Sequence, residues 1–330
     1  MKVSIIIPVY NVAPYIKRCL DSVADQTYTG EVECLLVDDC GTDDSIKIAK
    51  QWIRNYKGNI RFVIFHHPKN QGLSAARNTG IDVATGDYVY FLDSDDAITP
   101  DCIKKLTDLA VKYPDADFVL GNINNDGVGL ENHHFRDEVP ECVAGREKID
   151  YALLSVTIYN AWNRLVKKSF IIRHGLFFPV GIVHEDVYWL FFLAKHTQKA
   201  AFTNEGTYYY YYNMHSIMNS KAAMVKRINS YRVIIDAFYK ELRLHGSTSK
   251  YQRQFFADAF INNMELLVPF HSFIQWRSFW KQLLQMAWRT RKKATFYRIL
   301  FFFCSMPPLC MLTAFKWWRW RVRSYIISKI

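Results

Sequence analysis

The chain has 330 residues, half of them hydrophobic, and a net charge of +11 at neutral pH. This length suits one large domain or two smaller ones, and the hydrophobic content suits a packed core. Its seven cysteines are scattered and form no Cys-x-x-Cys pair, which argues against a zinc site or a disulfide framework. The cysteine pattern instead indicates a reducing, cytoplasmic compartment.

Strands and helices alternate in the elements predicted for the first 120 residues. Strands are predicted at 3–8, 33–37, 62–65, 88–92 and 118–120, and helices at 14–25, 45–56, 73–84 and 100–112. Repeated strand–helix units predict an α/β fold with a mainly parallel sheet between helices. Further along, we expect an apolar helix after Asp186, a tyrosine-rich strand at 207–212 and a helical region beyond 224.

Charge is distributed unevenly along the chain. Residues 221–330 contain 20 Lys and Arg against 4 acidic residues, whereas residues 1–220 contain 22 against 27. We therefore predict two parts, an α/β domain over 1–220 and a helical, basic and aromatic-rich region over 221–330. Such a basic region is typical of proteins with an anionic partner.

The segment 299–315 is apolar but too short for a transmembrane helix, and Pro307-Pro308 interrupt it. Basic flanks and nearby tryptophans favour a segment that lies in an anionic membrane surface. The alternative is a packed seam, or a contact between copies in a homo-oligomer. We expect no nucleic-acid partner, because so apolar a run does not suit a solvated groove.

Polar residues follow four successive predicted strands. They are Tyr10-Asn11 after the first strand, Asp38-Asp39 after the second, Asn70 beyond the third and Asp93 to Asp96 after the fourth. Ligands of parallel sheets bind beyond the carboxyl ends of the strands, so these residues predict one shared crevice. Asp93 and Asp95 project to the same side of an extended chain, and their hard oxygen ligands suit Mg²⁺ or Mn²⁺.

Five motifs in order carry a resemblance to a known family. They are Ile7-Pro8-Val9-Tyr10-Asn11, Val37-Asp38-Asp39, the run from Asn70 to Gly80, Leu92 to Asp96, and Glu185-Asp186. Together they resemble bacterial family 2 glycosyltransferases over about the first 220 residues. The resemblance implies an inverting enzyme of the GT-A (Rossmann-like) fold that uses a nucleotide-diphospho sugar.

The resemblance also implies roles on the nucleotide side. Asp39 would accept a hydrogen bond from the base, although its spacing equally fits a helix-capping turn residue. Pro8 and Tyr10 would form the wall beside the base, and Arg77 would neutralise phosphate charge. The other residues assigned to the nucleotide-sugar site are Asn11, Asn70, Asp93 and Ser94.

Metal and acceptor roles follow from the same resemblance. Asp95 would bind Mn²⁺ or Mg²⁺ directly, and Asp93 would hold the ribose and contact the metal through water. His215 is either a further metal or phosphate ligand or a plain loop histidine. Asp186, beside Glu185, would be the catalytic base that takes the acceptor proton; the alternative role for this pair is capping of the following helix.

These inferences predict a metal-dependent, inverting glycosyltransferase. Its expected donor is a UDP-sugar, and its expected acceptor is a hydroxyl of a lipid-linked or cell-surface glycan, at the inner face of the cell membrane. One alternative is a nucleotidyltransferase of similar fold, although the sequence lacks a Gly-rich N-terminal loop for a triphosphate. The other is a non-catalytic membrane or nucleic-acid adaptor on a degenerate transferase fold.

Overall fold

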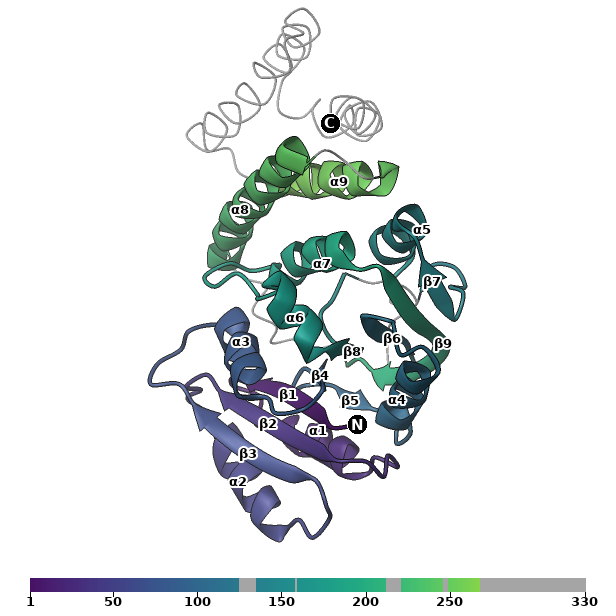
Figure 1. Cartoon of the computed structure of the whole chain (residues 1–330). Coiled ribbons are helices and arrows are strands. Elements are labelled where there is room, and N and C mark those ends of the chain that lie inside the picture. Colours follow the sequence, from purple (N-terminus) through teal and green to yellow (C-terminus); the bar gives the residue numbers. More distant parts are fainter. Residues whose placement is uncertain (125–134, 158, 212–220, 246–248, 268–330) are drawn as a thin grey trace, which may run out of the picture. The chain divides into compact units, whose positions relative to one another are not determined.

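The computed structural model describes residues 1–124, 135–157, 159–211, 221–245 and 249–267 (Figure 1). The chain divides into two compact units, Met1–Ser216 and Ile217–Ile330. Two of the sequence-based assignments, His215 and the segment 299–315, lie outside the described residues.

The first unit is built on one sheet with strand order β3-β2-β1-β4-β8-β6-β9-β5, and β7 also pairs with β9 (Figure 1). The strands are β1 Val3–Val9, β2 Val32–Asp38, β3 Arg61–His66, β4 Tyr88–Phe91, β5 Ala97–Ile98, β6 Phe118–Ile123, β7 Cys142–Ala144, β8 Arg164–Lys167 and β9 Lys199–Tyr209. Strands β3, β2, β1 and β4 are parallel. Strand β8 runs antiparallel to both β4 and β6.

Helices connect these strands. In the first unit they are α1 Ile16–Ala24, α2 Ser45–Asn55, α3 Leu73–Val83, α4 Cys102–Lys112, α5 Arg146–Tyr151, the π-helical turn η1 Ala152–Val156, α6 Lys168–His174 and α7 Glu185–His196. The second unit contains α8 Lys221–His245 and α9 Lys250–Leu267. Among the described helices, none is both long enough and apolar enough to span a membrane.

Strand β1 is buried on both faces and organises the core. Ile5 and Ile7 belong to a cluster that also contains buried residues of α1 and α4. On the other face, Ile6 lies against Gly80 of α3. Successive residues of a strand point to opposite sides, so α3 covers one face of the sheet while α1 and α4 cover the other. Packing on both faces explains why β1 is apolar at every position except Ser4.

The alternation predicted for the first 120 residues is confirmed, with element ends that differ by at most three residues, although the two-residue strand β5 was not predicted. The second half of the sheet differs from a simple parallel pattern. Of the strand predicted at 207–212, residues 207–209 form the end of a longer strand, β9, that begins at Lys199, and residue 212 lies outside the described residues. Strand β8 was not predicted, because it has only four residues and begins with a charged one, Arg164.

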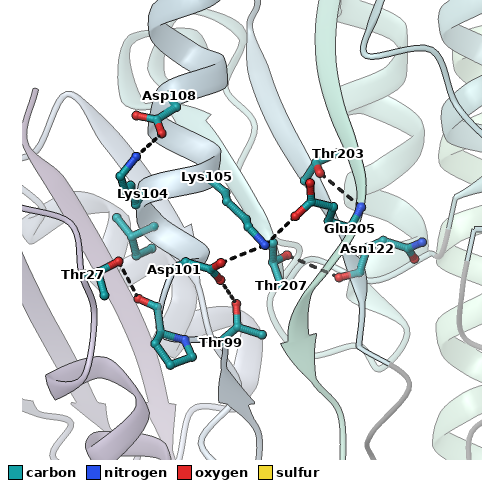
Figure 2. A network of polar contacts seen from close by, with 12 residues as sticks. Thr27, Thr99, Asp101, Lys104, Lys105, Asp108, Asn122, Thr203, Glu205 and Thr207 are labelled. Atoms are coloured by element: carbon teal, nitrogen blue, oxygen red, sulfur yellow. Dashed lines mark hydrogen bonds and ion pairs between the residues drawn. The ribbon is translucent and has the colours of Figure 1, made fainter.

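Lys105 of α4 lies between the carboxylate of Asp101, at the start of its own helix, and that of Glu205 in the sheet (Figure 2). Its Nζ is 2.9 Å from Asp101 and 2.6 Å from Glu205 of β9. Beside it, the Thr207 hydroxyl donates to the carbonyl oxygen of Asn122 in β6 at 3.3 Å (Figure 2). Partly exposed ion pairs contribute roughly 0.2–1 kcal/mol each, so this network gives β9 modest support.

The close approach of α3 to β1 predicts that Gly80 cannot be enlarged. A Cβ atom at this position would lie 2.3 Å from Cγ2 of the fully buried Ile6. We expect Gly80→Ala to lower the free energy of unfolding by roughly 1–3 kcal/mol, because overpacking outweighs the gain in helix propensity. Urea denaturation measures the change. Asp82→Ala, at an exposed position of α3, should stay within about 0.5 kcal/mol of wild type; equal stability of both variants would contradict this packing.

Candidate active site

The first group of predicted site residues follows β1. Pro8 is buried within the strand, and Tyr10, just beyond it, is 36% exposed. Asn11 has a left-handed backbone with φ of 53°. Its Oδ1 accepts a hydrogen bond from the Thr42 backbone N–H at 2.8 Å. Asn11 therefore braces the turn that follows β2, while Tyr10 offers an accessible aromatic ring.

Asp39, just beyond the end of β2, is buried and held by three hydrogen bonds. Its Oδ1 pairs with His67 Nδ1 at 2.7 Å and accepts the Gln71 backbone N–H at 2.8 Å. Its Oδ2 accepts the Gly72 backbone N–H at 2.7 Å. These three hydrogen bonds orient the carboxylate. Because a carboxylate offers about four lone-pair positions, Asp39 can accept one further hydrogen bond.

The loop before α3 therefore depends on Asp39. Asn70, assigned to the nucleotide-sugar site, is exposed on this loop directly before the residues that bind Asp39. His67 was missed by the sequence reasoning, although it directly follows β3. Its Nε2 also pairs with the Thr79 hydroxyl at 2.9 Å, which joins the end of β3 to α3.

Arg77 of α3 lies between the carboxylates of Asp93 and Glu185. Its Nη2 donates to Asp93 Oδ1 at 2.8 Å, and its Nη1 donates to Glu185 Oε1 at 2.7 Å. The guanidinium is also 5.2 Å from the ring centroid of Phe178. Burial alone would lower the pKa of Arg77, but the charges of Asp93 and Glu185 raise it above its ordinary value. The group is thus a permanent cation shared by two carboxylates.

The turn that follows β4 is anchored by Asp96. This buried carboxylate accepts hydrogen bonds from Tyr208 Oη at 2.7 Å and from the Tyr211 backbone N–H at 2.9 Å. Tyr208 Oη also accepts the Asp93 backbone N–H at 3.3 Å. Burial, with the charges of Asp95 and Asp93, raises the pKa of Asp96 well above its usual range. Asp96 thus holds the turn, a role that β9 makes possible through Tyr208.

Asp93 and Asp95 remain accessible on this anchored turn, whereas Ser94 is buried. The Asp93 side chain is 26% exposed and uses only Oδ1 to bind Arg77. Arg18 of α1 fixes the other end of the turn, because its Nη2 donates to the Asp95 carbonyl oxygen at 2.5 Å. The ring of Tyr211 stacks on this guanidinium at 3.5 Å.

This pair of carboxylates fits a divalent cation that is also coordinated by oxygen atoms of a bound substrate. Within the described residues, no group of three or more His, Cys, Asp and Glu side chains could hold a metal by itself. Mg²⁺ and similar cations are commonly bound by one or two carboxylates together with phosphate oxygens. The residues present, Asp93 and Asp95, therefore suit a metal that arrives with a diphosphate.

The pair Glu185-Asp186 forms the first turn of α7, after His184 with φ of 60°. Glu185 is buried against Arg77, and Asp186 Oδ1 accepts the Val187 backbone N–H at 2.8 Å. Burial and the neighbouring Glu185 charge raise the pKa of Asp186 to about 7, against the opposing effect of Arg77. Asp186 is therefore suited to exchange a proton near neutral pH.

Arg164 of β8 is a second buried arginine, and unlike Arg77 it was not identified from the sequence. Its Nη1 donates to Asn160 Oδ1 at 3.1 Å. Burial lowers the pKa of Arg164 to about 9, while the charge of Asp186 opposes that shift. No sequence motif marks this arginine, because only the unpredicted strand β8 brings it toward α7.

Comparisons with known proteins agree with this fold. The sequence profile of Glycosyl transferase family 2 matches residues 4–176, and the chain belongs to that family. The uncharacterized glycosyltransferase YibD of Escherichia coli is 29% identical over 239 residues, covering 70% of this chain and 67% of YibD. Glycosyltransferase GlyA of Streptococcus pneumoniae is 33% identical over 218 residues, 63% of this chain but 30% of GlyA.

A solved structure shows the same fold. A fragment of TarS from S. aureus, in complex with UDP-GlcNAc, superposes with a TM-score of 0.67 at 21% identity. The match covers 86% of this chain and 80% of the TarS fragment. The expected GT-A-type fold and the assignment of the chain as a glycosyltransferase are confirmed.

The buried charge cluster predicts a large effect on stability when its cation is removed. Arg77→Met would leave Glu185 buried without its partner, and we expect a loss of roughly 3–5 kcal/mol in the free energy of unfolding. Urea denaturation measures this loss. The double variant Arg77→Met/Glu185→Gln should recover part of it, because the uncompensated charge is gone. Arg54→Met, at an exposed position on α2, is the control; an Arg77→Met variant as stable as this control would disprove the ionic role.

Proposed function

We propose that this chain transfers a sugar from a UDP-sugar to a hydroxyl group of a glycan acceptor, with inversion at the anomeric carbon. The observation that carries the proposal is the shared guanidinium of Arg77. It brings Asp93, at the donor-side strand ends, and Glu185, beside Asp186, into one hydrogen-bonded cluster. Donor and acceptor groups must meet in this way for a direct displacement.

On the donor side, the buried carboxylate of Asp39 would accept the imide N–H of uracil. Its three protein hydrogen bonds fix its direction before the nucleotide binds, which reduces the entropy lost on binding. The exposed ring of Tyr10 offers a surface for the base to stack on. The TarS complex with UDP-GlcNAc supports a UDP-sugar in this position.

Asp95 and Asp93 would hold Mn²⁺ or Mg²⁺ together with the diphosphate. When bound, the cation would neutralise negative charge that develops on the leaving nucleotide. The protein's own contribution is a turn of fixed shape. Asp96 and Arg18 hold that turn through Tyr208 and the Asp95 carbonyl oxygen.

On the acceptor side, Asp186 would take the proton of the attacking hydroxyl. A base works best when its pKa lies near the working pH, and burial beside Glu185 places the pKa of Asp186 at about 7. Arg77 binds Glu185 on the neighbouring position, which holds the first turn of α7 in place. Inversion follows because one displacement occurs without a covalent intermediate.

The acceptor is proposed to be a lipid-linked or cell-surface glycan at the inner face of the membrane. The excess of Lys and Arg in residues 221–330 supports an anionic surface as partner. Membership in a glycosyltransferase family favours sugar transfer over the nucleotidyltransferase and adaptor alternatives.

A donor panel tests the proposed reaction. We expect nucleotide release from a UDP-sugar in the presence of Mn²⁺, and little release after chelation by EDTA. Asp95→Ala should raise the Mn²⁺ concentration needed for half-maximal rate, because a hard oxygen ligand is lost. Asp108→Ala, which removes an exposed carboxylate of α4, should leave that concentration unchanged. Undiminished turnover in EDTA would reject the metal role, and no turnover of any nucleotide sugar would reject the function.

The raised pKa of Asp186 predicts the pH dependence of the rate. Only the ionised carboxylate can accept a proton, so kcat/KM should rise through an apparent pKa of about 7 and level off above it. Glu185→Gln should shift this limb to lower pH, because a like charge is removed. Asp186→Asn should abolish the limb and lower kcat about 10²–10⁴-fold.

The matched control for this pH profile is Glu147→Gln, which makes the same change in the first turn of α5. Its limb should coincide with that of the wild type. A rising limb that persists in Asp186→Asn would assign the base to another residue.

A further inference from the structure

Asn78, the residue after Arg77 on α3, binds the loop between α6 and α7. Its Nδ2 donates to the Phe178 carbonyl oxygen at 2.8 Å, and its Oδ1 accepts the Phe178 backbone N–H at 2.8 Å. One side-chain amide thus satisfies both backbone groups of a residue 100 positions away. This reproduces the reciprocal pair of bonds that two antiparallel strands exchange.

Phe178 is the buried anchor of that loop. Its ring stacks on Trp189 of α7, with centroids 5.0 Å apart, and meets Phe91 of β4 edge-on at 5.3 Å. Trp189 Nε1 in turn donates to the Leu176 carbonyl oxygen at 2.9 Å. The hydrogen bonds of Asn78 therefore hold a point where the sheet, the loop and α7 all meet.

The chain from Phe178 to Glu185 is short and irregular. Val180 is 60% exposed, and both Gly181 and His184 have left-handed backbones, with φ of 87° and 60°. Glu185 begins α7 directly afterwards. Two consecutive residues of α3 thus hold the two ends of this segment: Asn78 holds its start and Arg77 holds its end.

We propose that Asn78 is a positioning residue for the acceptor side of the site. By holding Phe178 in place, Asn78 determines the position of the first turn of α7, which contains Glu185 and Asp186. This inference rests on the proposed function, in which Asp186 is the base. Both polar atoms of Asn78 bind the loop, so its loss should disturb the base while leaving Asp39 and its hydrogen bonds intact.

Asn78→Asp tests this role with almost no change in size. The substitution keeps an acceptor for the Phe178 N–H but places an oxygen against the Phe178 carbonyl. A misplacement of about 1 Å lowers rates by about 10²-fold, so we expect kcat to fall by that order while the KM for the UDP-sugar stays within about threefold. Asn55→Asp makes the same chemical change at the exposed end of α2 and should alter neither constant.

Hydrogen–deuterium exchange gives a readout that does not depend on turnover. In Asn78→Ala both bonds to Phe178 are lost, so amides in residues 176–190 should exchange faster while those of β1 and β2 keep wild-type rates. Unchanged exchange in 176–190, or faster exchange throughout the first unit, would overturn the proposal. A parallel loss of kcat and donor affinity in Asn78→Asp would also overturn it.

The two readouts separate this inference from the proposed function. If the wild type releases no nucleotide from any sugar donor, the function fails, yet the exchange rates still decide whether Asn78 holds the loop. If the wild type is active and exchange in 176–190 responds as expected without any change in kcat, the loop is held but does not position the base, and the proposal fails.

Discussion

The proposed site depends on the buried cation Arg77, which two carboxylates share. An unpaired charge in the interior is strongly unfavourable. The ion pairs therefore hold Arg77, Asp93 and Glu185 in fixed positions relative to one another. Those carboxylates lie on the turn after β4 and on the first turn of α7. One ion cluster therefore sets the spacing between the two halves of the proposed reaction centre.

Arg77 belongs to helix α3, and three separate contacts position this helix. Gly80 allows the helix to approach Ile6 of β1. The Gly72 backbone N–H, just before the helix, binds Asp39. Asn78 binds the loop that leads into α7. Helix α3 and the residues directly before it thus contact Asp39 at the end of β2, the core strand β1 and the loop before α7, so the position of α3 sets the geometry of the proposed site.

The sequence predicted much of this arrangement because local patterns were strong. Apolar runs that end in polar residues mark the first four strands, and the order of the motifs indicates the family. Strand β8 could not be predicted, since four residues beginning with Arg164 carry no periodic signal. Hydrogen bonds between distant segments could not be predicted either. His67 binds Asp39, and Tyr208 binds Asp96, only because the sheet brings these segments together.

Arg77 was expected to neutralise phosphate charge, and within the protein its guanidinium binds the carboxylates of Asp93 and Glu185. The charge of Arg77 lowers the pKa of Asp186 by less than burial and the Glu185 charge raise it. Burial then dominates at Asp186 and raises its pKa to about 7. If Arg77 instead bound Asp186 directly, the carboxylate would be held in its charged form and would be a weaker base. Placing the cation one residue away, on Glu185, keeps the helix turn fixed and leaves Asp186 able to accept a proton.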